Sequence, residues 1–229
     1  MSRFASVLAK SPLIQLDRAF DYLIPEAMGK QIAIGQEVIF PLGRSKKTQV
    51  GYVFGLSDTS EYATAAIASI QDASEVLSRQ LFDFLRAVAD RQCVALGELL
   101  ALAIPDHMST VQRLPAIQPR ALEVDILVPK LDSALGSRAA VLTSARQLEV
   151  AGTLFPDWSL LIIANALGVY SKGKSSIIVV PERSDIDIIS DLAQRLGIDD
   201  QFVFLKPSQK KSSRYQLFHQ IKESQQLIV

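Results

Sequence analysis

The sequence is poor in the residues that usually carry metal, redox or hydrolytic chemistry. Its 229 residues include one cysteine, Cys93, and two histidines, His107 and His219, which lie far apart. A single cysteine excludes a disulfide framework within the chain and suits a reducing, cytoplasmic setting. Neither histidine has a second ligand at metal-binding spacing, and no Ser/His/Asp or Cys/His constellation is present. We therefore expect no metal, no cofactor and no hydrolytic site.

Net charge and long apolar runs are also missing. The 24 basic and 24 acidic residues cancel, which argues against a protein that coats DNA through one basic face. The longest apolar run, residues 158–170, contains Asn165 and is too short to span a bilayer, so it predicts a buried helix and no membrane association. A chain of 229 residues with 48% hydrophobic and 21% charged content is typical of one large or two small globular domains.

The first hundred residues have the pattern of a small β domain. Alternating or β-branched segments predict strands, and the apolar spacing after Ser78 predicts two helices. The expected strands are residues 3–9, 20–24, 37–40, 49–54 and 65–70. The first expected helix is capped by Ser78 and has its apolar face between Leu81 and Ala89, and the second covers 96–104. This order predicts a small, strongly bent β-sheet or barrel with two helices, an architecture that often carries single strands of nucleic acid.

Residues 16–26 place one carboxylate between two aromatic rings, in the order Phe20, Asp21, Tyr22. Because successive side chains of a strand point to opposite faces, the two rings share one face and Asp21 lies on the other. The simplest interpretation is an edge strand with a solvated aspartate. The alternative is a small pocket, in which the rings stack on a nucleobase and the carboxylate accepts a hydrogen bond from a hydroxyl.

Four segments in this order favour the pocket: FDYLIPE, GQEVIFPLGR, VGYVFGLSDTSE and LGELLALAIP. Together they resemble the N-terminal DNA-binding domain of PriA, the replication-restart primosomal protein N-prime. The resemblance implies capture of the 3′ end of the nascent leading strand at an arrested fork. It also implies that Phe20, Asp21 and Tyr22 line the pocket for the terminal nucleotide, with Gly43 beside it. A lysine that the family often has further on is Ala68 in this chain.

A carboxylate near DNA normally repels phosphate, but a free 3′-hydroxyl can donate a hydrogen bond to it. We therefore expect Asp21 to select 3′-hydroxyl ends and to exclude a continuing phosphate. The nearby turn carries Arg44, Lys46 and Lys47. These cations are either an ordinary solvated loop or, beside a DNA-end pocket, phosphate contacts that position the strand without reading its sequence.

Residues 106–120 contain Pro115 and Pro119 and little periodicity, which is typical of a linker. This predicts a DNA-end-binding domain at 1–105, a linker at 106–120 and a second domain at 121–229. In the second domain, strand patterns alternate with helix patterns and predict a parallel α/β sheet. The expected strands are 139–143, 177–180, 202–205 and 227–229, and the expected helices are 157–170, 185–196 and 213–223.

The segment GKSSIIVVPE resembles part of the RecA-like helicase lobe of the same family. The resemblance implies a short family member with a partial, degenerate and truncated lobe. Where the family keeps its nucleotide loop, residues 144–149 of this chain contain no Gly-Lys-Thr, and no Asp-Glu-x-His segment follows. We therefore expect no ATP hydrolysis and no unwinding.

Residues 168–175 nevertheless satisfy the nucleotide-loop pattern G-x-x-x-x-G-K-[ST], with Gly173, Lys174 and Ser175 at its end. A working loop of this kind follows a strand and opens a helix. Here a predicted helix precedes it and a β-branched run follows. A helix C-terminus presents carbonyls to an anion, which is repulsive, so we interpret the match as coincidental.

The sequence therefore predicts a non-catalytic, DNA-binding replication-restart factor that captures the 3′-hydroxyl end of the nascent strand at stalled forks. Its expected partners are DNA and primosome proteins. Two alternatives remain open: an ATP-dependent helicase or other P-loop NTPase that uses residues 168–175, and a protein-interaction scaffold.

Overall fold

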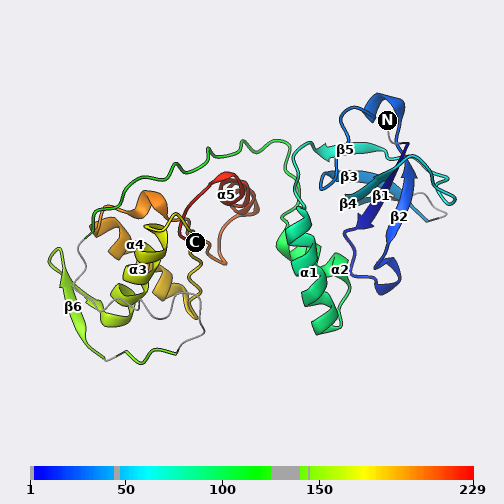
Figure 1. The fold of residues 1–229 in the computed structure, drawn as a ribbon. Coiled ribbons are helices and arrows are strands. Elements are labelled where there is room, and N and C mark those ends of the chain that lie inside the picture. Colours follow the sequence, from blue (N-terminus) through cyan, green and yellow to red (C-terminus); the bar gives the residue numbers. More distant parts are fainter. Residues whose placement is uncertain (1–2, 44–46, 125–139, 144) are drawn as a thin grey trace. The chain divides into compact units, whose positions relative to one another are not determined.

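A computed structural model describes residues 3–43, 47–124, 140–143 and 145–229 (Figure 1). The chain divides into two compact units, Met1–His107 and Met108–Val229. Each unit has a hydrophobic core of its own, and the two are described separately.

The first unit is built on a five-stranded antiparallel sheet. Its strands are β1 (Phe4–Ala9), β2 (Ala19–Leu23), β3 (Glu37–Leu42), β4 (Lys47–Ser57) and β5 (Ser69–Asp72), in the spatial order β2-β1-β4-β3-β5. Short 3₁₀ turns cover Ile14–Leu16 and Glu26–Met28. A parallel bridge between Leu23 and Ala66 joins the β2 edge to the segment that leads into β5. The sheet therefore closes on itself, and the predicted small, bent barrel is confirmed.

The barrel interior is filled by alternate residues of the strands. Val7, Val38, Phe40 and Val53 are fully buried there, as strand alternation requires. Residues 65–70, predicted as one strand, instead form the Ala66 bridge first and become β5 only from Ser69.

Two helices follow the sheet, α1 (Arg79–Gln92) and α2 (Leu96–Ala103). Ser78 caps α1, because its hydroxyl accepts a hydrogen bond from the Leu81 N–H at 3.2 Å, which satisfies one of the unpaired amides of the first turn. At Gly97 of α2, an added Cβ would lie 2.1 Å from the Ser11 carbonyl oxygen. Only glycine allows this close approach to the chain that leaves β1.

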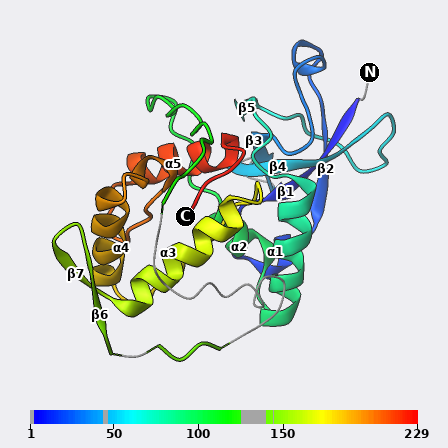
Figure 2. The ribbon, with the colours of Figure 1, turned by 60° about the vertical axis from the view of Figure 1, so that its left-hand side comes forward.

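The described residues of the second unit form one β-hairpin and three helices (Figures 1 and 2). The hairpin consists of β6 (Gln147–Val150) and β7 (Thr153–Pro156), and the helices are α3 (Asp157–Tyr170), α4 (Arg183–Arg195) and α5 (Lys211–Glu223), with a 3₁₀ turn at Asp199–Gln201. Its core includes Ile163, Leu192, Ile198 and Ile228. The helices lie where the sequence predicts them, but the hairpin was not predicted.

The partial parallel sheet predicted for the second unit is present among the described residues only as short parallel contacts. Residues 140–143 form no strand, and residue 139 lies outside the described residues. The other three predicted strands are joined by parallel bridges of Ser176 with Ile228 and of Phe202 with Ile228. Backbone hydrogen bonds extend these contacts, for example from the Ile178 N–H to the Val229 carbonyl at 2.6 Å. Parallel strands need cover on both faces, whereas Ile177 and Val179 are 78% and 88% exposed. The three segments are therefore parallel, as predicted, but they do not form continuous strands.

The segment predicted as a linker is tied to the second unit over much of its length. The Ile117 N–H donates to the Ser224 hydroxyl at 2.9 Å, and Arg120 forms an ion pair with Asp200 at 2.7 Å. This Arg120 contact lowers the pKa of Asp200 to about 2. Residues 117–120 are therefore held on the second unit.

Candidate nucleic-acid interface

Asp21 lies in the middle of β2, directly opposite Ser6 of β1. The Ser6 hydroxyl donates to Asp21 Oδ1 at 2.6 Å, and the Ser60 hydroxyl donates to Asp21 Oδ2 at 2.8 Å. No salt bridge to Asp21 is found among the described residues. A carboxylate has about four lone-pair sites, so this one is fixed in orientation and still able to accept hydrogen bonds.

The second of these hydroxyls comes from the loop that follows β4. Ser60 also accepts a hydrogen bond from the Tyr62 N–H at 3.3 Å, so one serine joins the loop to the Asp21 carboxylate. The Tyr62 side chain, two residues further along, is 80% exposed. Sequence reasoning missed Ser6 and Ser60, because no local motif shows which hydroxyls the barrel brings to one carboxylate.

Tyr22 does not present its ring to solvent, contrary to the stacking role expected for it. The residue is 6% exposed, and its ring lies 5.0 Å from the Phe40 ring in a tilted arrangement. Its hydroxyl donates to the Pro41 carbonyl at 2.9 Å, and burial raises the pKa of this phenol. Tyr22 therefore anchors the start of the β3–β4 turn to β2 from inside the barrel.

Phe20 lies on the same face of β2 as Tyr22 and is only partly buried. The Arg18 guanidinium carbon lies 4.9 Å from its ring centre. Asp21 is on the opposite face, as strand alternation predicts. Tyr22 is thus linked to the end of β3, next to the turn that carries Gly43. The rings of Phe20 and Tyr22 lie on one face of β2, and the Asp21 carboxylate lies on the other.

The backbone of Asp21 adds a hydrogen-bonding group to the site. The Ile24 N–H donates to the Arg3 carbonyl and the Leu23 N–H to the Ala65 carbonyl, so odd-numbered residues of β2 point their N–H groups away from β1. The Asp21 N–H therefore points outward, and no hydrogen bond from it is found within the part of the chain that the structure describes. Asp21 therefore offers both a backbone N–H donor and a fixed carboxylate at the β2 edge of the sheet.

The predicted phosphate-binding turn is described only in part. Gly43 is exposed, has a φ of 70° that favours glycine, and has nothing within 4 Å of a built Cβ. Lys47 opens β4 and is exposed. Arg44 and Lys46 lie outside the described residues. Ala68, which stands where the family often has lysine, is exposed, and its N–H donates to the Ile39 carbonyl at 2.8 Å.

Residues 168–175 lie at the C-terminal end of α3, so the order of elements around this motif is the reverse of a phosphate loop. Backbone N–H groups of the motif turn back onto the helix: Ser171 bonds Leu167, Gly173 bonds Tyr170 and Lys174 bonds Val169. Amides used in this way cannot point at a phosphate. Gly173, Lys174 and Ser175 are all exposed.

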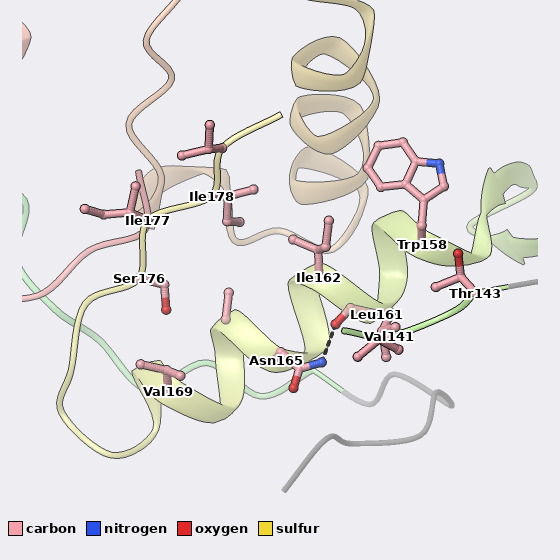
Figure 3. A pocket seen from close by; sticks show the side chains of 12 residues that line it. Val141, Thr143, Trp158, Leu161, Ile162, Asn165, Val169, Ser176, Ile177 and Ile178 are labelled. Atoms are coloured by element: carbon pink, nitrogen blue, oxygen red, sulfur yellow. Dashed lines mark hydrogen bonds between the residues drawn. The ribbon is translucent and has the colours of Figure 1, made fainter. Parts of the chain in front are cut away.

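A pocket of about 530 Å³ opens beside this segment (Figure 3). Figure 3 shows side chains of α3, Trp158 and Asn165 among them, on one side and Ser176 and Ile178 on the other. Asn165 donates to the Leu161 carbonyl at 2.7 Å, and the buried Ser176 hydroxyl has no hydrogen-bond partner within the described residues. Among the described residues, those that line this pocket include no cation that could neutralise a phosphate.

The described residues contain no group of three or more His, Cys, Asp or Glu side chains placed to hold a metal ion. No described helix has both the length and the apolar character needed to cross a membrane.

Comparison with known proteins identifies the first unit. Residues 6–105 match the family model of the 3′DNA-binding domain (3′BD) of PriA. The match begins at Ser6, the serine that bonds Asp21, and ends after α2, so it covers the barrel and both of its helices. No curated protein matches the chain.

Proposed function

Because residues 6–105 form a 3′DNA-binding domain of the PriA family, we propose that this chain captures the 3′-hydroxyl end of the nascent strand at a stalled replication fork. In this proposal it carries out no catalysis and marks the fork for assembly of the primosome. The domain supports DNA-end binding in replication restart; the residue roles and the absence of catalysis are our inference.

The observation that carries the proposal is the fixed carboxylate of Asp21, which forms no ion pair with a described residue. Its two oxygens accept hydrogen bonds from Ser6 and Ser60 at 2.6 and 2.8 Å. A terminal 3′-hydroxyl can donate to a remaining lone pair, whereas a 3′-phosphate has no hydroxyl at that position and brings a like charge. Two unit charges 4 Å apart repel by about 1 kcal/mol in water and about 4 kcal/mol near a protein surface. The carboxylate therefore discriminates ends by charge as well as by hydrogen bonding.

Other groups near Asp21 hold the DNA strand whose 3′ end binds to this carboxylate. The outward Asp21 N–H is available to a nucleotide oxygen, and Phe20 offers a partly exposed ring on the other face of β2. The Tyr22 hydroxyl bonds the Pro41 carbonyl near the end of β3, two residues before Gly43. We assign phosphate contacts to Arg44, Lys46 and Lys47. Because the chain carries no net charge, a few local contacts rather than a basic face provide the affinity, and its salt dependence is shallow.

We further propose that the second unit neither hydrolyses ATP nor unwinds DNA. This is supported by the position of residues 168–175 after a helix and by the return of their N–H groups to the helix carbonyls. The exposed side chains of Ile177 and Val179 support a different task for this unit, which is contact with a primosome protein. Replacing Ile177 by lysine then weakens recruitment of that protein to DNA and leaves DNA-end binding unchanged.

The test compares strands that differ only at the 3′ end. Fluorescence anisotropy with the full chain measures Kd for one oligonucleotide ending in 3′-hydroxyl and for the same oligonucleotide ending in 3′-phosphate. We expect the wild type to prefer the hydroxyl by at least about fivefold, which corresponds to about 1 kcal/mol. Asp21→Asn keeps the shape of the side chain and removes its charge. Its Oδ1 can still accept from one serine hydroxyl, and its Nδ2 can donate to the other. We expect this variant to lose the preference.

The matched control is Asp58→Asn, which removes an exposed carboxylate from the loop that carries Ser60. It should keep the wild-type preference. Equal wild-type affinities for the two ends, or an undiminished preference in Asp21→Asn, would contradict the proposed role of this carboxylate.

A further inference from the structure

The outer face of the barrel carries a row of side chains that starts at Asp21 and crosses two strands. Asp21 of β2 lies opposite Ser6 of β1, and Ser6 lies opposite Gly55 of β4. These residues alternate with Val7 and Val53, which point into the barrel and are fully buried. Cross-strand neighbours on one face are in reach of each other, so the row leads directly from the carboxylate to β4.

At the β4 end of the row, a β-bulge places one extra residue, Phe54. The register of β1 and β4 shifts between Ser6 with Gly55 and Val7 with Val53, and Phe54 has no partner of its own. A bulge re-aims a side chain, and here the Phe54 ring packs on Phe82 of α1. The ring centres are 4.5 Å apart with an interplanar angle of 43°.

Arg79 from the first turn of α1 completes this group. Its guanidinium carbon lies 5.6 Å from the Phe54 ring centre and 5.5 Å from the Phe82 ring centre. The side chain is 73% exposed and bonds Asp83 only through Nε, so its terminal amino groups have no partner among the described residues. We call Phe54, Phe82 and Arg79 the Arg79 platform.

Between Asp21 and the Arg79 platform, the row consists of Ser6, whose side chain is small, and Gly55. Gly55 has no side chain, and an added Cβ there would meet only the Ser6 side chain, at 3.8 and 4.0 Å. These are ordinary contact distances, so the position accepts a side chain without strain. Glycine leaves the floor of the row open.

We propose that the Arg79 platform binds the DNA strand upstream of its 3′ end, about three nucleotides before the terminus. The inference rests on the proposed capture of that end at Asp21. Asp21 and Gly55, the neighbour of Phe54 in β4, are separated by two strand spacings, about 10 Å. A stacked strand advances about 3.4 Å per nucleotide, so about three nucleotides reach the β4 end of the row. A planar guanidinium held on aromatic rings stacks on a base or donates two hydrogen bonds to a phosphate, and both contacts tolerate any base sequence.

Two substitutions test the platform without emptying the core. Arg79→Gln removes the guanidinium, and Gly55→Leu places a side chain across the open floor. Arg91→Gln on the same helix is the matched control, since Arg91 is exposed and lies outside the platform. Each variant is assayed as the full chain against 3′-hydroxyl oligothymidylates of two, four, six and eight nucleotides, and against the same strands ending in 3′-phosphate.

We expect the wild-type affinity to rise between two and four nucleotides. Arg79→Gln and Gly55→Leu should weaken binding of the four-nucleotide and longer strands by between about fivefold and a hundredfold. They should leave dinucleotide binding and the preference for 3′-hydroxyl unchanged, and Arg91→Gln should resemble the wild type throughout.

The inference is overturned if both platform variants bind the longer strands as tightly as the wild type does, or if they weaken two-nucleotide and eight-nucleotide strands equally. Failure of the proposed function is a different result. It is a wild type that binds 3′-hydroxyl and 3′-phosphate strands equally or binds neither.

Discussion

The hydrogen bonds from Ser6 and Ser60 give a direct way to perturb the site while keeping its charge. Replacing both serines by alanine leaves the Asp21 carboxylate in place and removes the two hydroxyls that fix it at 2.6 and 2.8 Å. The carboxylate is partly exposed, so water replaces the lost hydrogen bonds and the fold is expected to survive.

The cost to DNA-end binding follows from the orientation that is lost. A free aspartate has three staggered χ1 wells, and restricting it to one well on binding costs up to RT ln 3, which is about 0.65 kcal/mol or threefold in Kd. The two hydroxyls also fix the direction in which each carboxylate oxygen points. An upper bound on the loss of binding free energy is therefore one net hydrogen bond, about 1.5 kcal/mol or tenfold in Kd. We expect a three- to tenfold weaker affinity for 3′-hydroxyl strands.

The assay is fluorescence anisotropy on the full-length double variant, with urea unfolding as a check on stability. Ser109→Ala, which removes an exposed hydroxyl outside the site, is the control. The single variants should each show part of the loss. An unchanged or tighter affinity of the double variant for 3′-hydroxyl ends would refute the view that the serines position Asp21 for binding.

Three other predictions concern the fold and the second unit. Ser78→Ala removes the cap bonded by the Leu81 N–H and should lower the free energy of unfolding by about 1 kcal/mol in urea titrations; no change would show that the cap contributes nothing. Burial raises the pKa of Glu37, so the folded protein favours the protonated carboxyl. The contribution of this group to the free energy of unfolding is fully present below about pH 4. It is lost as the pH rises through the folded-state pKa. Glu37→Gln, which can still accept the Tyr52 hydroxyl, should show a flatter pH dependence of unfolding than the wild type between pH 4 and pH 7. Calorimetry should detect no ATP binding by the wild type or by Lys174→Ala, and a DNA-stimulated ATPase rate lost on this substitution would refute the non-catalytic proposal.

Much of the first unit could be predicted from the sequence because local and tertiary signals agree there. Strand alternation placed the two rings opposite Asp21, and Ser78 marked the start of α1. The burial of Tyr22 was not predictable, since its ring is covered by Phe40, which is distant in the chain. For the same reason, the hydroxyls of Ser6 and Ser60 could be found only once β1 and the loop after β4 were placed.

The second unit shows where periodicity fails. Its helices were predicted because their apolar spacing is a local property. β-branched segments such as residues 177–180 indicate an extended conformation, but the length of a parallel ladder depends on which helices cover both of its faces. The β6–β7 hairpin was missed because its turn is formed by Ala151 and Gly152, with φ values of 47° and 77°, and alanine gives little indication of a left-handed conformation.

The central claim is that this chain recognises the place where a DNA strand ends. The most direct test measures the affinity of the full chain for a linear single strand with a 3′-hydroxyl and for a closed circle of the same sequence and length, at the same salt concentration. We predict that the linear strand binds at least fivefold more tightly, as expected for a preference worth about 1 kcal/mol or more. Equal affinity for the circle would contradict it.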